Sequence, residues 1–157
     1  MTETFTIVET GDYNITYIAK DTANNTKKII ELISVYDDLT PTISVKNPPG
    51  TTYSLNSAFK IPEYTANDES GKYTVDVILI LPTNEMRILT HHVHDEEAEE
   101  VDVIEYALDP EKEIYNESFI IDKTTCRLQL VGTYRLRYVV YDTAYNTTTL
   151  EYSFVVK

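Results

Sequence analysis

The sequence contains one cysteine, no tryptophan and only four glycines among its 157 residues. Cys126 has no second cysteine with which to form an internal disulfide, so packing has to stabilise the fold. With so little glycine there is no phosphate-binding loop, and neither a Gly-x-Ser-x-Gly nor a His-Glu-x-x-His motif is present. These absences predict that the chain is not an enzyme.

Basic residues are half as frequent as acidic residues. The chain has 13 Lys and Arg against 26 Asp and Glu, which gives a net charge of -13. Nucleic acids and anionic lipids bind through cationic side chains, so neither is an expected partner. No apolar run is long enough to span a bilayer, and residues 1–10 lack the regions of a signal peptide. We therefore expect no membrane insertion, and an export signal, if one exists, would lie upstream.

Tyrosine, in contrast, is abundant, with 13 residues. Tyrosine and the recurrent threonine suit the pleated, half-buried surface of a sheet, so the composition predicts an all-β fold. The length suits one full domain and a fragment better than two full domains.

A repeat with a fixed offset organises the chain. Residues 11–26 (GDYNITYIAKDTANNT) align without gaps on residues 132–147 (GTYRLRYVVYDTAYNT), each pair 121 positions apart, as Gly11 is from Gly132. Internal repeats mark modular architectures. The repeat predicts that residues 1–37 are the C-terminal strands of a preceding, partial repeat and that residues 38–157 form a complete domain.

Each copy has the pattern of a β-hairpin. Apolar residues at every second position share one face of a strand, and they are Tyr13, Ile15, Tyr17 and Ala19 in the first copy and Tyr134, Leu136, Tyr138 and Val140 in the second. An Asp-Thr-Ala-x-Asn-Thr turn follows in both copies. Asp caps such turns and Asn tolerates left-handed backbone, so we assign structural roles to Asp21, Asn25, Asp142 and Asn146. Phe5 and Ile7 predict one further strand before Gly11.

The complete copy contains several more short alternating segments. They are residues 42–46, 57–62, 73–81, 86–93, 118–122 and 127–130. About seven strands with turns between them indicate an immunoglobulin-like antiparallel β-sandwich of Greek-key topology. The acidic stretch near residues 94–117 breaks the pattern, and we interpret it as an insertion formed by one or two helical turns or by a charged loop.

These residues resemble the bacterial immunoglobulin-like repeats, including the hyalin-repeat type. The last strands of that family typically read Gly-Thr-Tyr-x-φ-x-Tyr-x-φ-x-Asp-x-Ala-Gly-Asn-x-Thr, where φ is apolar. The second copy matches at Gly132-Thr-Tyr134, Tyr138, Asp142-Thr-Ala144, Asn146 and Thr147, and the first copy at the equivalent positions. The glycine of the family pattern is replaced by Asn24 and Tyr145. Because tyrosine is strained in left-handed backbone, we expect the second turn to differ from the first.

The resemblance implies a module in a row of similar repeats, in an extracellular or bacterial cell-surface protein. The leading hypothesis is that the module acts as a spacer or adhesion element. Its expected partners are neighbouring repeats and a protein or carbohydrate ligand. One alternative is an ancillary, carbohydrate-binding domain of a secreted hydrolase. The other is a structural or virion subunit whose missing strands come from another chain.

The candidate sites are few. Tyr13 and Tyr134 follow a glycine by two residues, where a phenol can bond to backbone as in the tyrosine corner of sandwich domains. His92 and His94 share a strand face, and with Asp95 they would offer two imidazoles and a carboxylate to a transition metal, although solvated histidines are the simpler interpretation.

Calcium is the second metal candidate, and no cofactor is otherwise expected. It needs several oxygen ligands, which Asp37, Asp38, Asp68 and Glu69 would supply near a domain junction. No Asp-x-Asp-x-Asp loop supports this hypothesis.

Overall fold

A computed structural model describes residues 4–7, 9–108 and 118–157. The chain divides into two units, Met1–Asp38 and Leu39–Lys157. All regular elements of the described residues are β-strands, as the composition predicts. Among these residues no helix has the length and apolar character to cross a lipid bilayer.

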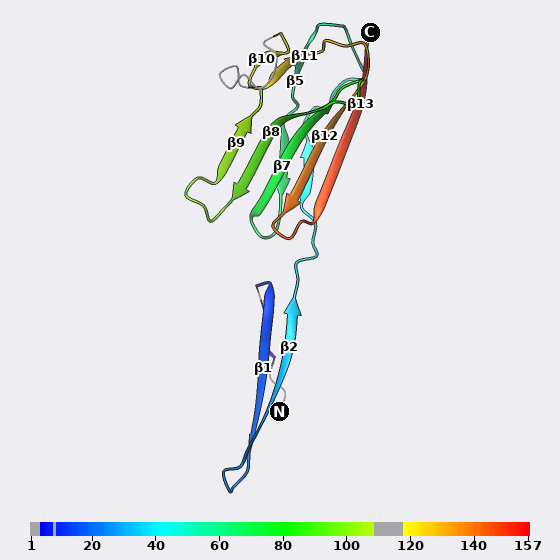
Figure 1. The fold of residues 1–157 in the computed structure, drawn as a ribbon. Helices are drawn as coiled ribbons and strands as arrows, with labels where there is room; N and C mark the ends of the chain where they lie inside the picture. Colours follow the sequence, from blue (N-terminus) through cyan, green and yellow to red (C-terminus); the bar gives the residue numbers. More distant parts are fainter. Residues whose placement is uncertain (1–3, 8, 109–117) are drawn as a thin grey trace. The chain divides into compact units, whose positions relative to one another are not determined.

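The first unit is a single hairpin of two ten-residue strands, β1 (Gly11–Lys20) and β2 (Thr26–Val35). They are antiparallel, with Gly11 opposite Val35 and Lys20 opposite Thr26 (Figure 1). Within the described residues, β1 and β2 pair only with each other. The further strand predicted at Phe5 and Ile7 is wrong, because residues 4–7 are not in a strand. Their counterparts in the second unit include β11 (Thr125–Arg127), which pairs with β5 (Ala58–Lys60), and the described part of the first unit contains no strand equivalent to β5.

The second unit contains the remaining strands of the described chain. They are β3 (Thr42–Val45), β4 (Thr52–Tyr53), β5 (Ala58–Lys60), β6 (Tyr64–Asn67), β7 (Lys72–Ile80), β8 (Met86–Asp95), β9 (Asp102–Tyr106), β10 (Ile120–Asp122), β11 (Thr125–Arg127), β12 (Gly132–Asp142) and β13 (Thr147–Val156).

These strands form one large sheet and two small ones. The large sheet has the order β4-β13-β12-β7-β8-β9, and the small ones have the orders β10-β11-β5 and β3-β6. All pairings among the described strands of the second unit are antiparallel except β13 with β4, which is parallel. Apolar side chains of the large sheet and of β5 and β11 enclose one core, so this unit is a β-sandwich.

The structure corrects the interpretation of the segment after His94. Residues 102–106 form β9, which pairs with β8 at the edge of the large sheet, in place of the helical turns or loop expected there. Residues 109–117 of the predicted insertion lie outside the described residues. β9 was missed because its side chains are mostly exposed, so the sequence lacks the alternation that marks a half-buried strand.

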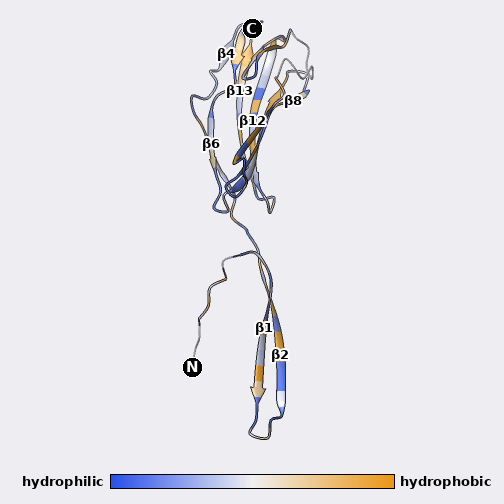
Figure 2. Cartoon of the chain, turned by 90° about the vertical axis from the view of Figure 1, so that its left-hand side faces the viewer, coloured by the Kyte–Doolittle hydropathy of each residue, from blue (hydrophilic) through white to orange (hydrophobic). Residues whose placement is uncertain are grey.

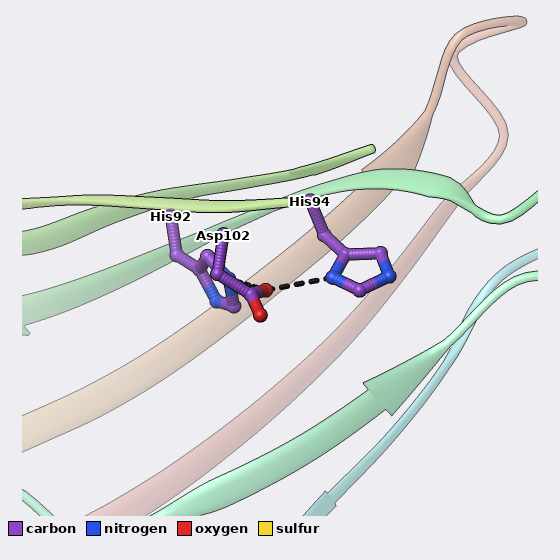
Figure 3. A group of neighbouring side chains, drawn as sticks. All are labelled: His92, His94 and Asp102. Atoms are coloured by element: carbon purple, nitrogen blue, oxygen red, sulfur yellow. Dashed lines mark hydrogen bonds and ion pairs between the residues drawn. The ribbon is translucent and has the colours of Figure 1, made fainter. Parts of the chain in front are cut away.

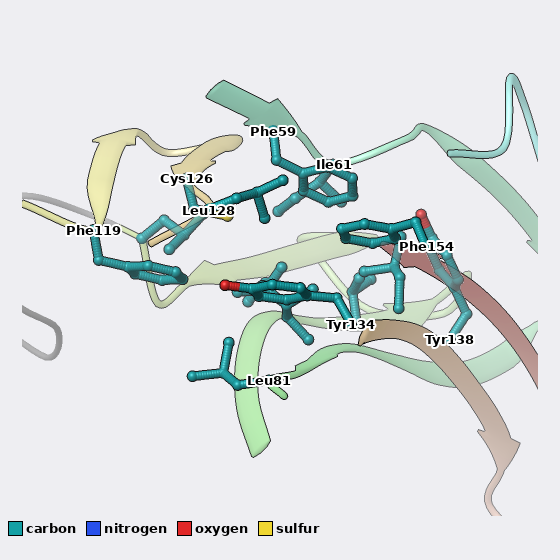
Figure 4. Close-up of a cluster of buried hydrophobic side chains, with 14 of the residues drawn as sticks. Phe59, Ile61, Leu81, Phe119, Cys126, Leu128, Tyr134, Tyr138 and Phe154 are labelled. Atoms are coloured by element: carbon teal, nitrogen blue, oxygen red, sulfur yellow. The ribbon is translucent and has the colours of Figure 1, made fainter. Parts of the chain in front are cut away.

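The core is built from the alternating residues that the sequence indicates. Tyr134, Phe154 and Phe59 stack in a row, with ring centroids 5.4 Å and 4.9 Å apart (Figure 4). Leu136, Tyr138 and their neighbours on the inner face of β12 are fully buried. A buried aromatic or aliphatic side chain contributes about 1.5–3 kcal/mol, so this row and its surroundings hold the two layers together. Cys126 lies in the same core as a free thiol, and burial raises its pKa to about 12.

Gly132 is required where β12 begins. Its φ of 132° lies in a region that side chains disfavour, and a Cβ there would lie 2.9 Å from Cβ of Pro82. The glycine therefore permits the close approach of the β7–β8 turn.

Candidate functional site

The two repeated turns have the same hydrogen bonds. Oδ1 of Asp21 accepts from the backbone N–H of Asn25 and Oδ2 accepts from its side-chain amide, at 2.9 and 2.8 Å. Asp142 makes the same two bonds to Asn146, again at 2.9 and 2.8 Å. These bonds hold the pKa of Asp21 below its ordinary value, with the Asn25 side chain as the main cause. Both aspartates thus bond within their own hairpins.

Tyr145 adopts the conformation that we expected it to avoid. Its φ is 66°, close to the 68° of Asn24 at the equivalent position of the first hairpin. The N–H of Tyr145 donates to the carbonyl of Asp142, as that of Asn24 does to Asp21. The expectation of a different turn is therefore wrong, because the aspartate-centred bonds impose the conformation despite the strain.

The two corner tyrosines bond to backbone four residues upstream. The hydroxyl of Tyr134 accepts from the N–H of Leu130 at 3.0 Å, and that of Tyr13 donates to the carbonyl of Glu9 at 2.8 Å. Tyr134 is buried and Tyr13 is only half-buried. Both hydroxyls thus bond to the residue four positions upstream, but they do so in opposite roles and in environments of different burial.

Three side chains from two strands converge at the open edge of the large sheet (Figure 3). His92 and His94 alternate with outward residues on β8, so they share one face, and Asp102 of β9 lies directly opposite His94. Oδ1 of Asp102 lies 2.8 Å from Nε2 of His92 and 2.7 Å from Nδ1 of His94. One ligand atom from each of the three residues lies within 4.8 Å of the others. We call His92, His94 and Asp102 the edge cluster.

Neighbouring rings fix both imidazoles. The hydroxyl of Tyr64, on the opposing β6, lies 2.8 Å from Nδ1 of His92. Tyr73 stacks on His94 with centroids 4.5 Å apart and planes 15° from parallel. The two imidazoles are 11% and 16% exposed and the Asp102 side chain is 53% exposed, so the cluster opens to solvent on the carboxylate side.

The electrostatics of the cluster favour an ionised carboxylate. Hydrogen bonds from His94 and then from His92 hold the pKa of Asp102 below its ordinary value. Burial raises the pKa of the Tyr64 phenol, so this group stays protonated beside His92. The cluster presents two aromatic nitrogens and one anionic oxygen, a donor set that divalent transition metals bind.

The structure does not bring Asp95 into this group. Its carboxylate lies 3.4 Å from Nζ of Lys72 and accepts from the N–H of Glu97 at 2.9 Å. As the next residue after His94 on a strand, Asp95 points to the other face. Asp102 takes its place, and the sequence held no separate signal for it because its position depends on β9. His91 also faces away and bonds to Asp76 at 2.6 Å.

The calcium hypothesis involves residues of both units. Asp37 and Asp38 belong to the first unit, and Asp68 and Glu69 to the second. Asp68 is buried, and its Oδ1 accepts from the N–H of Ser70 at 3.0 Å, so it caps the turn before β7. Among the described residues, the edge cluster is the one group of His, Cys, Asp or Glu found to fit a shared metal ion. Calcium binding by the four acidic residues stays a prediction.

A scan against protein-family models matches none to this chain, and a search of curated proteins finds none with significant similarity.

Proposed function

We propose that this chain is a non-catalytic, immunoglobulin-like repeat module that acts as a spacer or adhesion element in a larger extracellular or bacterial cell-surface protein. The observation that carries the proposal is the recurrence of one hairpin. β1 and β2 pair in the register of β12 and β13, so that Gly11 lies opposite Val35 as Gly132 lies opposite Val156. The first hairpin has the turn and corner of a sandwich domain, but among the described residues it has no opposing sheet, as expected for part of a repeat.

The strand order of the second unit supports the immunoglobulin-like assignment. In variable-type immunoglobulin domains, a sheet with the central order G-F-C-C′-C″ faces a sheet that contains strands B, E and D. The order β13-β12-β7-β8-β9 corresponds to the first, and β5-β11-β10 to the second, with the strands in the same sequence order. The Tyr134 hydroxyl bonded to the Leu130 backbone corresponds to the tyrosine corner of such domains.

The exposed apolar residues of the first unit support a row of modules. Tyr17, Ile29 and Ile30 are each at least half exposed. Tyr138, the counterpart of Tyr17, is fully buried. An isolated two-stranded hairpin is marginally stable in water, so β1 and β2 need further strands. In a row of modules, those strands come from the preceding part of the same repeat.

A fusion protein tests the proposal. Residues 39–131 are joined to the N-terminal side of residues 11–157, so that β1 and β2 take the places of β12 and β13. We expect a second cooperative unfolding transition and slow hydrogen exchange in residues 11–35. The matched control is the same fusion with Tyr17→Asp, which puts a charge into the new core and should abolish the second transition. If the hairpin of the fusion stays unprotected, and Tyr17→Asp changes nothing, the proposal is wrong.

The same exposed apolar residues favour one alternative, in which another chain completes the half sandwich. Sedimentation of the full chain separates the two hypotheses. A concentration-dependent oligomer that Tyr17→Asp dissociates would favour completion by another copy, and a monomer would favour the row of modules.

A further inference from the structure

We propose that the edge cluster of His92, His94 and Asp102 binds one divalent transition-metal ion of the zinc class and thereby links β8 to β9. The proposal concerns the second unit alone and does not depend on the repeat. It rests on the convergence of three donor atoms from two strands, on the fixed orientation of both imidazoles and on the opening of the cluster to solvent.

The donor atoms already point at one region. Oδ1 of Asp102 lies within 2.8 Å of a ring nitrogen of each histidine, on both sides. Donors around a tetrahedral zinc ion lie about 2.0–2.2 Å from the metal, hence roughly 3.3 Å from one another. To admit the ion, the carboxylate therefore has to withdraw by less than about 1 Å from each ring. The two ring nitrogens, which lie within 4.8 Å of each other, have to come to about 3.3 Å from each other. Asp102 is the exposed member, so it is free to make this movement.

The positions of the protons on the two imidazoles also permit metal binding. A metal-bound imidazole nitrogen carries no proton, so a neutral ring that donates to Asp102 has to hold its single proton on the other ring nitrogen once the ion is bound. For a His92 that binds the ion through Nε2, that nitrogen is Nδ1, which lies 2.8 Å from the Tyr64 hydroxyl. A hydroxyl both donates and accepts, so Tyr64 bonds His92 before and after metal binding. Such an outer partner, which fixes the tautomer of a ligating histidine, is typical of metal sites.

The choice of ion follows from the donors. Two nitrogens and one oxygen suit zinc and its neighbours, whereas calcium and magnesium prefer sites made of oxygen alone. Three protein ligands leave one coordination position for water on the exposed side. The net charge of -13 raises the local concentration of any cation but does not select among them.

The metal would stabilise an exposed edge. β9 pairs with β8 alone among the described strands, and Val103 and Ile104 are each about two-fifths exposed. Edge strands with few buried contacts open readily. An ion bound to His92 and His94 on β8 and to Asp102 on β9 would close that edge.

Zinc titration of the full chain tests the proposal. Chelator-treated protein is titrated with ZnCl₂ by calorimetry in excess magnesium, which occupies weak acidic sites. We expect one saturable zinc ion per chain, and slower hydrogen exchange of residues 102–106 when it is bound. Cobalt substitution should give the visible absorption bands of a four-coordinate ion.

Three variants separate this site from the acidic surface. Asp102→Asn keeps a hydrogen-bonding oxygen but loses the anionic ligand, and it should weaken zinc binding at least tenfold. Tyr64→Phe removes only the outer partner of His92 and should weaken binding by about tenfold. The matched control is His91→Gln, which removes a histidine from the opposite face of β8 and should leave the affinity unchanged. Thermal unfolding without zinc checks that each variant is folded.

Two results would overturn the proposal. One is the absence of a saturable zinc equivalent in the folded wild-type chain. The other is equal zinc affinity in the wild type and in folded Asp102→Asn, which would place the ion elsewhere on the acidic surface.

Discussion

The hairpins Gly11–Val35 and Gly132–Val156 share their register, their turn bonds and their corner tyrosine, yet only the second is part of a core. Tyr17 is 51% exposed and its counterpart Tyr138 is 0% exposed. Figure 2 shows apolar and polar stretches along β1 and β2, and among the described residues these two strands pair only with each other. The comparison separates two levels of folding. Local sequence sets the hairpin, and burial requires a facing sheet and a third strand.

Of the equivalent positions in the two hairpins, Tyr138 and Tyr17 should differ most in the effect that a substitution has on stability. Tyr138→Ala should destabilise the second unit by about 3–5 kcal/mol, because it leaves a cavity and removes the donor to the carbonyl of Pro62. Tyr17→Ala should change the free energy of unfolding of the same transition by less than about 0.5 kcal/mol. Urea unfolding of both variants measures this. Equal effects would mean that the first hairpin is also buried in solution.

Substitutions of the glycine at the start of each hairpin should give the next largest difference in stability. Gly132→Ala should cost roughly 2 kcal/mol through strained backbone, with a further cost from contact with Pro82. Nothing lies within 4 Å of a Cβ at Gly11, whose φ is 141°. Gly11→Ala should therefore leave the transition of the second unit unchanged. Thermal unfolding of the pair checks this, and a harmless Gly132→Ala would show that the β7–β8 turn yields easily.

Replacing the strained turn residue, Tyr145, should increase the stability of the second unit, whereas the substitutions at Tyr138 and Gly132 should lower it. Tyr145 has a positive φ and is 81% exposed, so its ring contributes little packing to offset the strain. Tyr145→Asn makes the second turn resemble the first, and it should stabilise the second unit by about 0.5–1 kcal/mol. The reciprocal change, Asn24→Tyr, should leave this transition as it is. Denaturant midpoints of the two variants measure both effects, and loss of stability in Tyr145→Asn would show that the tyrosine makes a favourable contact.

The smallest effect concerns the pH dependence of the first turn. Because the folded pKa of Asp21 lies below its ordinary value of 3.8, the turn is stabilised above that value. This stabilisation is lost as the pH falls through the lower, folded pKa. An NMR titration of the Asp21 carboxyl should have its midpoint below 3.8, with the Asn25 amide shifting in parallel. Asn25→Ala should raise the midpoint towards 3.8, and an unchanged midpoint would mean that the Asn25 side chain is not the main cause.

The elements that the sequence predicts best are those whose signal is local. The alternation around Tyr138 places it in the core, and the spacing of Asp142 and Asn146 predicts one turn. β9 has no such signal because both of its faces are largely exposed. β4 is only two residues long and is defined by parallel pairing with the end of β13, a contact between distant segments.

Within the edge cluster, the sequence likewise places some residues and not others. His92 and His94 are two residues apart on one strand, so the sequence suffices to place them on one face. The choice of Asp102 over Asp95 depends on the register between β8 and β9. Tyr64 reaches His92 from the opposing layer, which no local pattern reveals.

The sequence alone thus determined the all-β class, the repeated hairpin, the capping roles of Asp and Asn in its turns and the inward face of the second copy. These follow from side-chain periodicity and from hydrogen bonds over a few residues. The tertiary structure decided which copy is buried, which carboxylate joins the two histidines and where the sheet ends. Those outcomes depend on strand pairing between distant segments, whose free energy comes from packing that no single segment contains.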